Sequence, residues 1–385
     1  MITRRSFFKA ASLSGLGLSI LPASVQKMFA GMNTMEKPKT NIEDALKYPR
    51  NENSMPGKYP GEVVHVYNKN SVVDNKFDEN VIYEMVKSGM LNLTGKTELK
   101  DAWLTFVSPK DVIGLKVNPV AGATLSTSLE IVRVIIKQLE ESGISRNKLV
   151  IWDRREFEMH EVGFNSANFP GVKIIGTERK DDKGSFYDTN GKLYGEDMID
   201  KNWYYWADCE QKYDAETLPY MINEGKYSYY SKILTQQVDK VINIPILKNA
   251  GASVTLCLKN LGFGVISNTS RLHKQLWHDT SAEVCAFPPV RDKVVLNIVD
   301  GIKGCFDKGP GADPKFFTNY YSVLIGSDPV AVDRIGYDIV IKKRIEENLQ
   351  KKESATGRMF MDMAEKLKLG VADINKINLK KIEMV

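Results

Sequence analysis

Cysteine and histidine are scarce in this chain, with four of each among 385 residues. The cysteines stand at positions 209, 257, 285 and 305, too far apart for the C-x-x-C spacings of zinc sites and ferredoxin clusters. We therefore do not expect an iron–sulfur cluster held by this chain alone. The even number of cysteines leaves two alternatives open, two disulfides or buried free thiols.

Common nucleotide-binding and nucleophile motifs are also missing. Neither G-x-G-x-x-G nor G-x-x-x-x-G-K-[ST] stands at a junction between a strand and a helix, and no G-x-S-x-G occurs. These absences argue against a standard dinucleotide site, a P-loop and a serine hydrolase.

A strong excess of charge is absent once the N-terminus is set aside. The formal net charge is +5, and residues 1–30 hold four basic and no acidic residues, so residues 31–385 carry only about +1. A nearly neutral chain argues against a nucleic-acid partner and a polybasic membrane surface. No apolar run reaches 18 residues, so we expect no stable transmembrane span.

The N-terminus carries the most specific signal in the sequence. Residues 3–9 read Thr-Arg-Arg-Ser-Phe-Phe-Lys, which is typical of a twin-arginine export signal, and an apolar run at 13–21 follows. We predict a signal peptide over residues 1–30, recognition by the twin-arginine translocation machinery, and a periplasmic or extracytoplasmic location. Export in the folded state also favours a bound prosthetic group, and the sequence names none.

The remaining chain divides into a polar segment at 31–60, predicted as a linker, and an α/β domain at 61–385. Residues 111–117 and 149–153 have strand-like apolar runs, and residues 128–142 between them have helical spacing. This pattern predicts two parallel strands joined by a right-handed crossover. Further strands are predicted at 63–67, 172–175, 238–246, 293–299 and 322–325. The predicted fold is a mostly parallel sheet flanked by helices.

Between about residues 182 and 230 the alternation of strands and helices breaks. This interval holds nine of the sixteen tyrosines, together with Trp203 and Trp206. We predict an aromatic-rich insertion. Aromatic side chains at this density can line a pocket or a sugar-stacking platform, or they can build a small core of their own.

Five short motifs follow one another in order along the domain. They are Gly114-Leu-Lys116-Val-Asn118-Pro, Ile244-Pro-Ile-Leu-Lys248, Thr255-x-x-x-Lys259-Asn260-Leu-Gly262, Val299-Asp300-Gly301-Ile with Gly309-Pro310-Gly311, and Ser327-Asp328-Pro329-Val-Ala-Val-Asp333. Over about residues 61–340 this series resembles the bacterial and archaeal family called domain of unknown function 362. Because that family is defined by sequence, the resemblance implies no particular reaction.

The resemblance has limits that bear on function. Some relatives look like iron–sulfur proteins through appended ferredoxin modules, and no such module occurs here. Many relatives place a histidine after the Lys-Thr that ends the middle strand, where this chain reads Lys248-Asn249-Ala250. A family Lys-Pro-Asn pattern reads Lys116-Val117-Asn118. No role for that histidine is therefore carried over to this chain.

Several motif residues are candidates for binding. Ligands of open α/β sheets bind outside the carboxyl ends of the strands, and polar motif residues follow predicted strands. The predicted binding residues are Lys116, Asn118, Lys248, Lys259 and Asn260. Ammonium and amide groups suit a carboxylate or phosphate ligand. Each lysine by itself is equally typical of a solvated surface cation.

Asp300 and His278 are the candidates for proton or metal chemistry. Asp300 is predicted at a strand end, before a glycine-rich loop at 301–311. His273 and His278 are five residues apart, about 140° around a helix, and so do not form an i,i+4 zinc pair. His278 and Asp279 can supply metal ligands with Asp300 completing the site, or His278 can act as a base oriented by a carboxylate.

Two functions remain open from the sequence. One is an exported enzyme whose lysines hold an anionic substrate or cofactor, a carboxylate or phosphate, while His278 and Asp300 handle protons or a metal. The other is a non-catalytic accessory protein that captures a small ligand or cofactor for an exported redox partner.

Overall fold

The structure is a computed structural model that describes residues 37–223, 225–311 and 313–384. The predicted signal peptide at 1–30, with its twin-arginine motif, lies outside the described residues. Within them, no helix is both long and apolar enough to cross a membrane.

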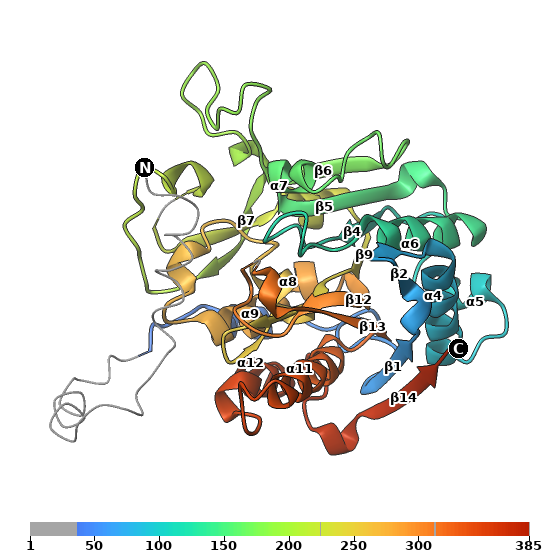
Figure 1. Cartoon of the computed structure of the whole chain (residues 1–385). Helices are drawn as coiled ribbons and strands as arrows, with labels where there is room; N and C mark the ends of the chain where they lie inside the picture. The colour runs from blue at the N-terminus through green and yellow to red at the C-terminus, as the bar shows by residue number, and fades with distance from the viewer. Residues whose placement is uncertain (1–36, 224, 312, 385) are drawn as a thin grey trace, which may run out of the picture.

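A ten-stranded sheet runs through the molecule (Figure 1). Its main path has the order β14-β1-β13-β12-β9-β4-β5-β6, and β10 and β11 are attached beside β12. The bounds are β1 Glu62–Tyr67, β4 Ile113–Lys116, β5 Leu149–Arg155, β6 Lys173–Glu178, β9 Lys240–Asn243, β10 Ile246–Ala250, β11 Ser253–Val254, β12 Val294–Cys305, β13 Phe317–Gly326 and β14 Asn378–Glu383.

The sheet is mostly parallel, which confirms the predicted α/β fold. Strands β12, β9, β4, β5 and β6 are parallel to their neighbours in this run. Strand β13 is antiparallel both to β1 and to β12. The parallel core follows from the continuous apolar runs, because strands covered on both faces need no polar side.

Helices cover both faces of the sheet (Figure 1). The helices are α3 Ile42–Leu46, α4 Glu79–Thr94, α5 Leu99–Leu104, α6 Leu129–Glu141, α7 Glu156–Glu161, α8 Cys257–Gly262, α9 Trp277–Ala286, α10 Pro288–Arg291, α11 Pro329–Glu346 and α12 Ala355–Lys366. One buried apolar cluster lies under α4, α5 and α6, and a second lies under α8, α9, α11 and α12. The central strands of the sheet are therefore covered by apolar side chains on both faces.

Helix α6 shows how local sequence builds this arrangement. Its apolar stripe, which includes Ile131, Ile135 and Leu139, is buried against the sheet. Ser128 begins the helix as its N-cap, and Gly143 follows its end with a φ of 93°. The helix thus connects β4 to the parallel strand β5 as the sequence predicts.

The predicted insertion forms a separate two-stranded sheet of β7 (Ile199–Trp206) and β8 (Tyr227–Ser231). Part of it projects from the body at the top of Figure 1, in green. Tyr205 and Tyr230 on this hairpin are fully buried and join the apolar cluster under α9. The insertion therefore contributes to the core, while Tyr204, Tyr227 and Tyr229 pack as an aromatic group on its other side.

Two boundaries differ from the sequence predictions. Residues 37–60 of the predicted linker pack on the domain, because Ala45 and Met55 are fully buried and Met55 N–H donates to Arg291 O at 2.8 Å. Strand β12 continues through Gly301 to Cys305, so Asp300 lies inside a strand and the predicted loop at 301–311 begins later. Gly301 permits close strand pairing there, since a Cβ would lie 2.8 Å from Ser322 O.

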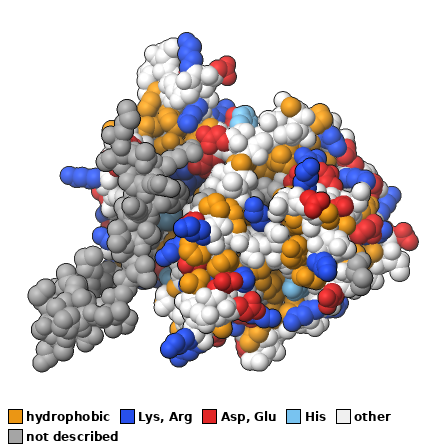
Figure 2. Space-filling model, in the orientation of Figure 1, with side chains coloured by type: hydrophobic (Ala, Val, Ile, Leu, Met, Phe, Trp, Pro, Cys, Tyr) orange, Lys and Arg blue, Asp and Glu red, His pale blue; other side chains and the backbone are white. Residues whose placement is uncertain are grey.

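On the face shown in Figure 2, basic and acidic side chains are interspersed. This agrees with the nearly neutral charge of residues 31–385.

Candidate functional site

Lys116 ends strand β4 and is fully buried. Its Nζ donates to Val117 O at 3.0 Å and to Asn260 Oδ1 at 3.2 Å, and it forms an ion pair with Asp153 of β5. Burial lowers the pKa of Lys116, and the Asp153 carboxylate opposes that change. Because β4 and β5 are parallel neighbours, their carboxyl ends bring this pair together.

Lys248 on β10 is also fully buried, and its contacts within the described part of the chain are with neutral groups. Its Nζ donates to Asn118 Oδ1 at 3.0 Å and to Val120 O at 2.8 Å. Burial lowers the pKa of Lys248 to about 7. This lysine fixes the loop that follows β4.

Buried amides link the two lysines. Asn118 Nδ2 donates to Asn260 Oδ1 at 3.1 Å, and Asn260 Nδ2 donates to Asn243 Oδ1 at 2.8 Å. Four of the five predicted binding residues are thus brought together, namely Lys116, Asn118, Lys248 and Asn260. We call these four residues the buried network. Its polar groups form hydrogen bonds with one another. Such contacts are typical of residues that hold β4, β10 and α8 in position.

Lys259, the fifth predicted binding residue, has a different setting. It is half-buried, and its Nζ lies 3.4 Å from the centre of the Phe263 ring and 3.5 Å from His273 Nε2. Among the described residues, no carboxylate forms an ion pair with it. Burial lowers the pKa of Lys259 well below its usual value, and the charges of Arg154 and Lys248 act in the same direction.

Arg154 and His273 stand next to Lys259. Arg154, near the end of β5, donates to Phe263 O at 3.2 Å and to Thr269 Oγ1, and its Nε lies 3.4 Å from Glu178 Oε1. His273 is partly exposed. Its ring centre lies 4.5 Å from that of Phe263, and its Nδ1 lies 3.0 Å from Thr269 O. Desolvation of the ring and the positive charge of Lys259 lower the pKa of His273 well below its usual value.

We call Arg154, Lys259 and His273 the cationic cluster. Lys259 is one of the binding residues predicted from the sequence, whereas Arg154 is not, although Arg154 follows a predicted strand directly. The strand-end rule that selected Lys116 applies to Arg154 as well. His273 was weighed only as half of a zinc pair, and its proximity to Lys259 depends on how the chain folds back after α8.

Asp300 has a buried position away from solvent, with 2% of its surface exposed. Its Oδ2 accepts hydrogen bonds from Ser128 N–H at 2.8 Å and Ser128 Oγ–H at 2.7 Å, and its Oδ1 accepts one from Ile302 N–H at 3.3 Å. Burial raises the pKa of Asp300, and the bonds from Ser128 oppose that change. The geometry favours a positioning role, in which Asp300 fixes the start of α6, over the predicted catalytic role.

His278 and Asp279 begin helix α9. The His278 ring packs against Trp277 and Phe360, and its Nδ1 has no hydrogen-bond partner among the described residues. Burial lowers the pKa of His278. Asp279 forms an ion pair with Lys37. In the part of the chain that the structure describes, no three His, Cys, Asp or Glu side chains are grouped to hold a metal, so His278, Asp279 and Asp300 do not form the candidate metal site.

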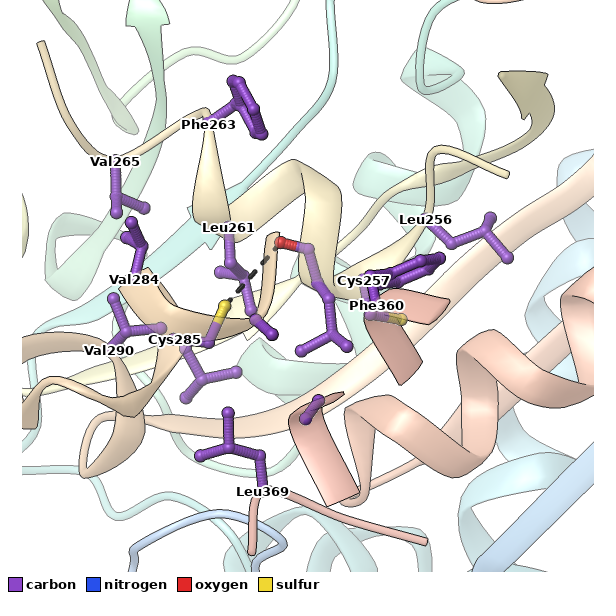
Figure 3. Packing of buried hydrophobic residues seen from close by; sticks show 14 of the residues in the cluster. Leu256, Cys257, Leu261, Phe263, Val265, Val284, Cys285, Val290, Phe360 and Leu369 are labelled. Atoms are coloured by element: carbon purple, nitrogen blue, oxygen red, sulfur yellow. Dashed lines mark hydrogen bonds between the residues drawn. The ribbon is translucent and has the colours of Figure 1, made fainter. Parts of the chain in front are cut away.

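All four cysteines are free and buried. Figure 3 shows Cys257 and Cys285 among apolar side chains of α8 and α9, with Cys285 Sγ 3.7 Å from Leu258 O. Of the two alternatives for the cysteines, the structure shows the free thiols. The same apolar packing holds α8, the helix that carries Lys259 and Asn260.

The comparisons with known proteins cover part of the chain. The model of the family described as "Domain of unknown function (DUF362)" matches residues 213–338. This segment includes Lys248, Lys259, Asn260, His273 and Asp300, whereas Lys116, Asn118 and Arg154 precede it. No curated protein matches the chain.

A crystal structure of a protein from Thermotoga maritima is similar at 9% sequence identity, with a TM-score of 0.36. The similarity covers 69% of this chain and 59% of that protein, so this chain spans less than two thirds of it. This likeness is too distant to inform the motifs, so only the match to the family model is relevant to them. Over residues 213–338, the chain resembles the DUF362 family.

Proposed function

We propose that this protein binds a small carboxylate or phosphate at the cationic cluster and acts on it as an exported enzyme. The observation that carries the proposal is the setting of Lys259. Its ammonium is half-buried next to Arg154 and His273, and the described residues supply it with no carboxylate partner. Enclosed charge without a counter-charge is costly, and an anionic ligand would provide that counter-charge.

The groups of the cluster suit such a ligand. The Arg154 guanidinium can bind an anion by a charge-assisted N–H bond, and a lysine ammonium binds the same anion as a point charge. Arg154 is held in place by Thr269, Phe263 and Glu178. A fixed guanidinium loses little conformational entropy on binding, which favours affinity.

A calorimetric titration with inorganic phosphate and with small di- and tricarboxylates tests the proposal. Lys259→Met removes the charge and keeps most of the side-chain length. We expect the Kd to rise at least about tenfold, because a hydrogen bond to a charged group contributes about 1.5–3 kcal/mol.

Lys274 supplies the matched control, since it is an exposed lysine next to His273. Lys274→Met should leave the Kd within about a factor of two, as is usual for exposed charges. An unchanged Kd in Lys259→Met, or equal losses in both variants, would contradict the proposal.

An accessory protein without turnover is the second candidate. It is favoured because the carboxylate of Asp300, the predicted catalytic acid or base, already accepts two hydrogen bonds from Ser128. Such a protein would bind the anion or a cofactor for an exported redox partner. Turnover assays with the ligand that binds in the titration distinguish the two candidates.

Export and location are part of the proposal. Residues 3–9 support recognition by the twin-arginine translocation machinery and a periplasmic or extracytoplasmic location.

A further inference from the structure

The Nζ of Lys259 lies in surroundings that favour a neutral amine. The rings of Phe263 and Trp277 lie 3.4 Å and 5.8 Å from it and limit its contact with water. Arg154 and Lys248 add positive charge nearby. Desolvation and neighbouring cations are the two ways in which proteins turn a lysine into a nucleophile. Attraction of the ammonium to the ring of Phe263 opposes this only weakly at a partly exposed site.

His273 is oriented toward this amine. Its Nδ1 lies 3.0 Å from Thr269 O, a carbonyl that only accepts hydrogen bonds, so Nδ1 carries the hydrogen in the neutral ring. The lone pair of Nε2 then faces Lys259 Nζ at 3.5 Å. Contacts of this kind are often long in the absence of substrate and shorten when it binds.

Thr269 joins His273 to Arg154. Its carbonyl contacts the imidazole, and its hydroxyl contacts the guanidinium. One short segment therefore places an anion-binding group and a proton-accepting group around the same amine. That arrangement fits a ligand with a negative charge close to an electrophilic carbon.

We propose that Lys259 is a nucleophilic amine that forms an imine with an anionic aldehyde or oxo acid, with His273 as its proton partner and Arg154 as the anion-binding group. This inference rests on the proposed function, because it assigns a ligand class to the same cluster.

The chemistry balances without another reactant. The free amine of Lys259 adds to the carbonyl carbon to form a C–N bond. His273 Nε2 accepts the two amine protons in turn and passes each to the carbonyl oxygen, which first becomes a hydroxyl and then leaves as water. The sum is one amine and one carbonyl giving one imine and one water, with no change of oxidation state.

Reductive trapping in the purified full-length protein tests this inference. The probe is glyoxylate with sodium cyanoborohydride, which reduces the imine to a stable secondary amine that peptide mass spectrometry locates. We expect the adduct on Lys259 to form at least about 100-fold faster than on Lys274, the scale of general acid–base catalysis. Labelling of Lys259 no faster than of Lys274 would overturn the inference, and this comparison needs no variant.

Two variants separate the roles. Lys259→Arg keeps a positive charge but removes the nucleophilic amine, so trapping at this position should be lost. His273→Asn should slow trapping about 100-fold and remove the dependence of its rate on imidazole ionisation. An unchanged rate and pH profile in His273→Asn would overturn its role as proton partner.

The outcome also distinguishes this inference from the proposed function. Phosphate binding without trapping leaves the anion site intact and overturns the imine. If the unmodified protein does not bind phosphate, both the imine and the proposed function are overturned.

Discussion

At the scale of single residues, the five predicted binding residues divide into two kinds. Lys116 and Lys248 are buried, and the ammonium of each donates hydrogen bonds to acceptors within the protein. Lys259 is half-buried and lacks an acidic partner among the described residues. A motif can locate such residues, but the difference between them depends on packing by segments that are distant in sequence.

The pH dependence of anion binding follows from Lys259 and His273. Burial lowers the pKa of both, so each loses its proton at a lower pH than usual. An anion binds the protonated forms better, which raises their pKa and takes up protons. Affinity should therefore fall as the pH rises through the lowered pKa of Lys259.

Calorimetry between about pH 6 and pH 9, in buffers of different ionisation enthalpy, measures this linkage. The apparent enthalpy should vary with the buffer, and Lys259→Met should reduce the variation. Arg154 stays charged over this range and sets the affinity that remains at high pH. An affinity independent of pH would contradict protonation of the cluster on binding.

At the scale of elements, carboxylates fix the helices that carry the site. Asp333 of α11 accepts hydrogen bonds from Cys257 N–H at 2.6 Å and Leu258 N–H at 3.0 Å, at the start of α8. Asp300 does the same for α6 through Ser128. These motif aspartates are therefore explained by helix positioning.

Asp328 connects four points of the backbone. It begins α11 by accepting from Val330 and Ala331 N–H, each at 2.9 Å, and it also accepts from Gly61 at 2.9 Å and Val371 at 3.0 Å. Asp followed by Pro is typical of an N-cap and first helical turn, whereas the links to residues 61 and 371 join segments that are distant in sequence.

Asp328→Asn should lower the free energy of unfolding by about 3 kcal/mol, because its NH₂ group faces backbone donors and the charge is lost. Urea unfolding measures this change. Asp74→Asn, at an exposed turn, is the control and should change stability by less than about 0.5 kcal/mol. Equal effects in the two variants would contradict the connecting role of Asp328.

At the scale of the whole molecule, local pattern predicted the α/β sheet well. The units around β4, α6 and β5 are contiguous in sequence, so their apolar spacing is sufficient. Strand β12 was predicted too short because Gly301 and Gly304 were interpreted as turn residues, whereas they allow close packing with β13 and β10. Residues 37–60 were predicted as a linker because only a few apolar side chains, such as Met55, fasten them to the domain.

The prediction of export rests on the twin-arginine motif at residues 3–9. Replacing both Arg4 and Arg5 by lysine should block twin-arginine export, so the protein should remain in the cytoplasm of a host with this pathway. Cell fractionation followed by immunoblotting measures the distribution. Equal periplasmic amounts with and without the two substitutions would contradict this route.

The location of a bound anion tests the central claim most directly. The measurement is a crystal structure of the protein grown with selenate, with anomalous scattering from selenium used to locate the anion. The account predicts a peak in contact with Lys259 Nζ, His273 Nε2 and the Arg154 guanidinium, and its loss in crystals of Lys259→Met. Selenate bound only at other places, or no selenate peak at the cationic cluster, would contradict it.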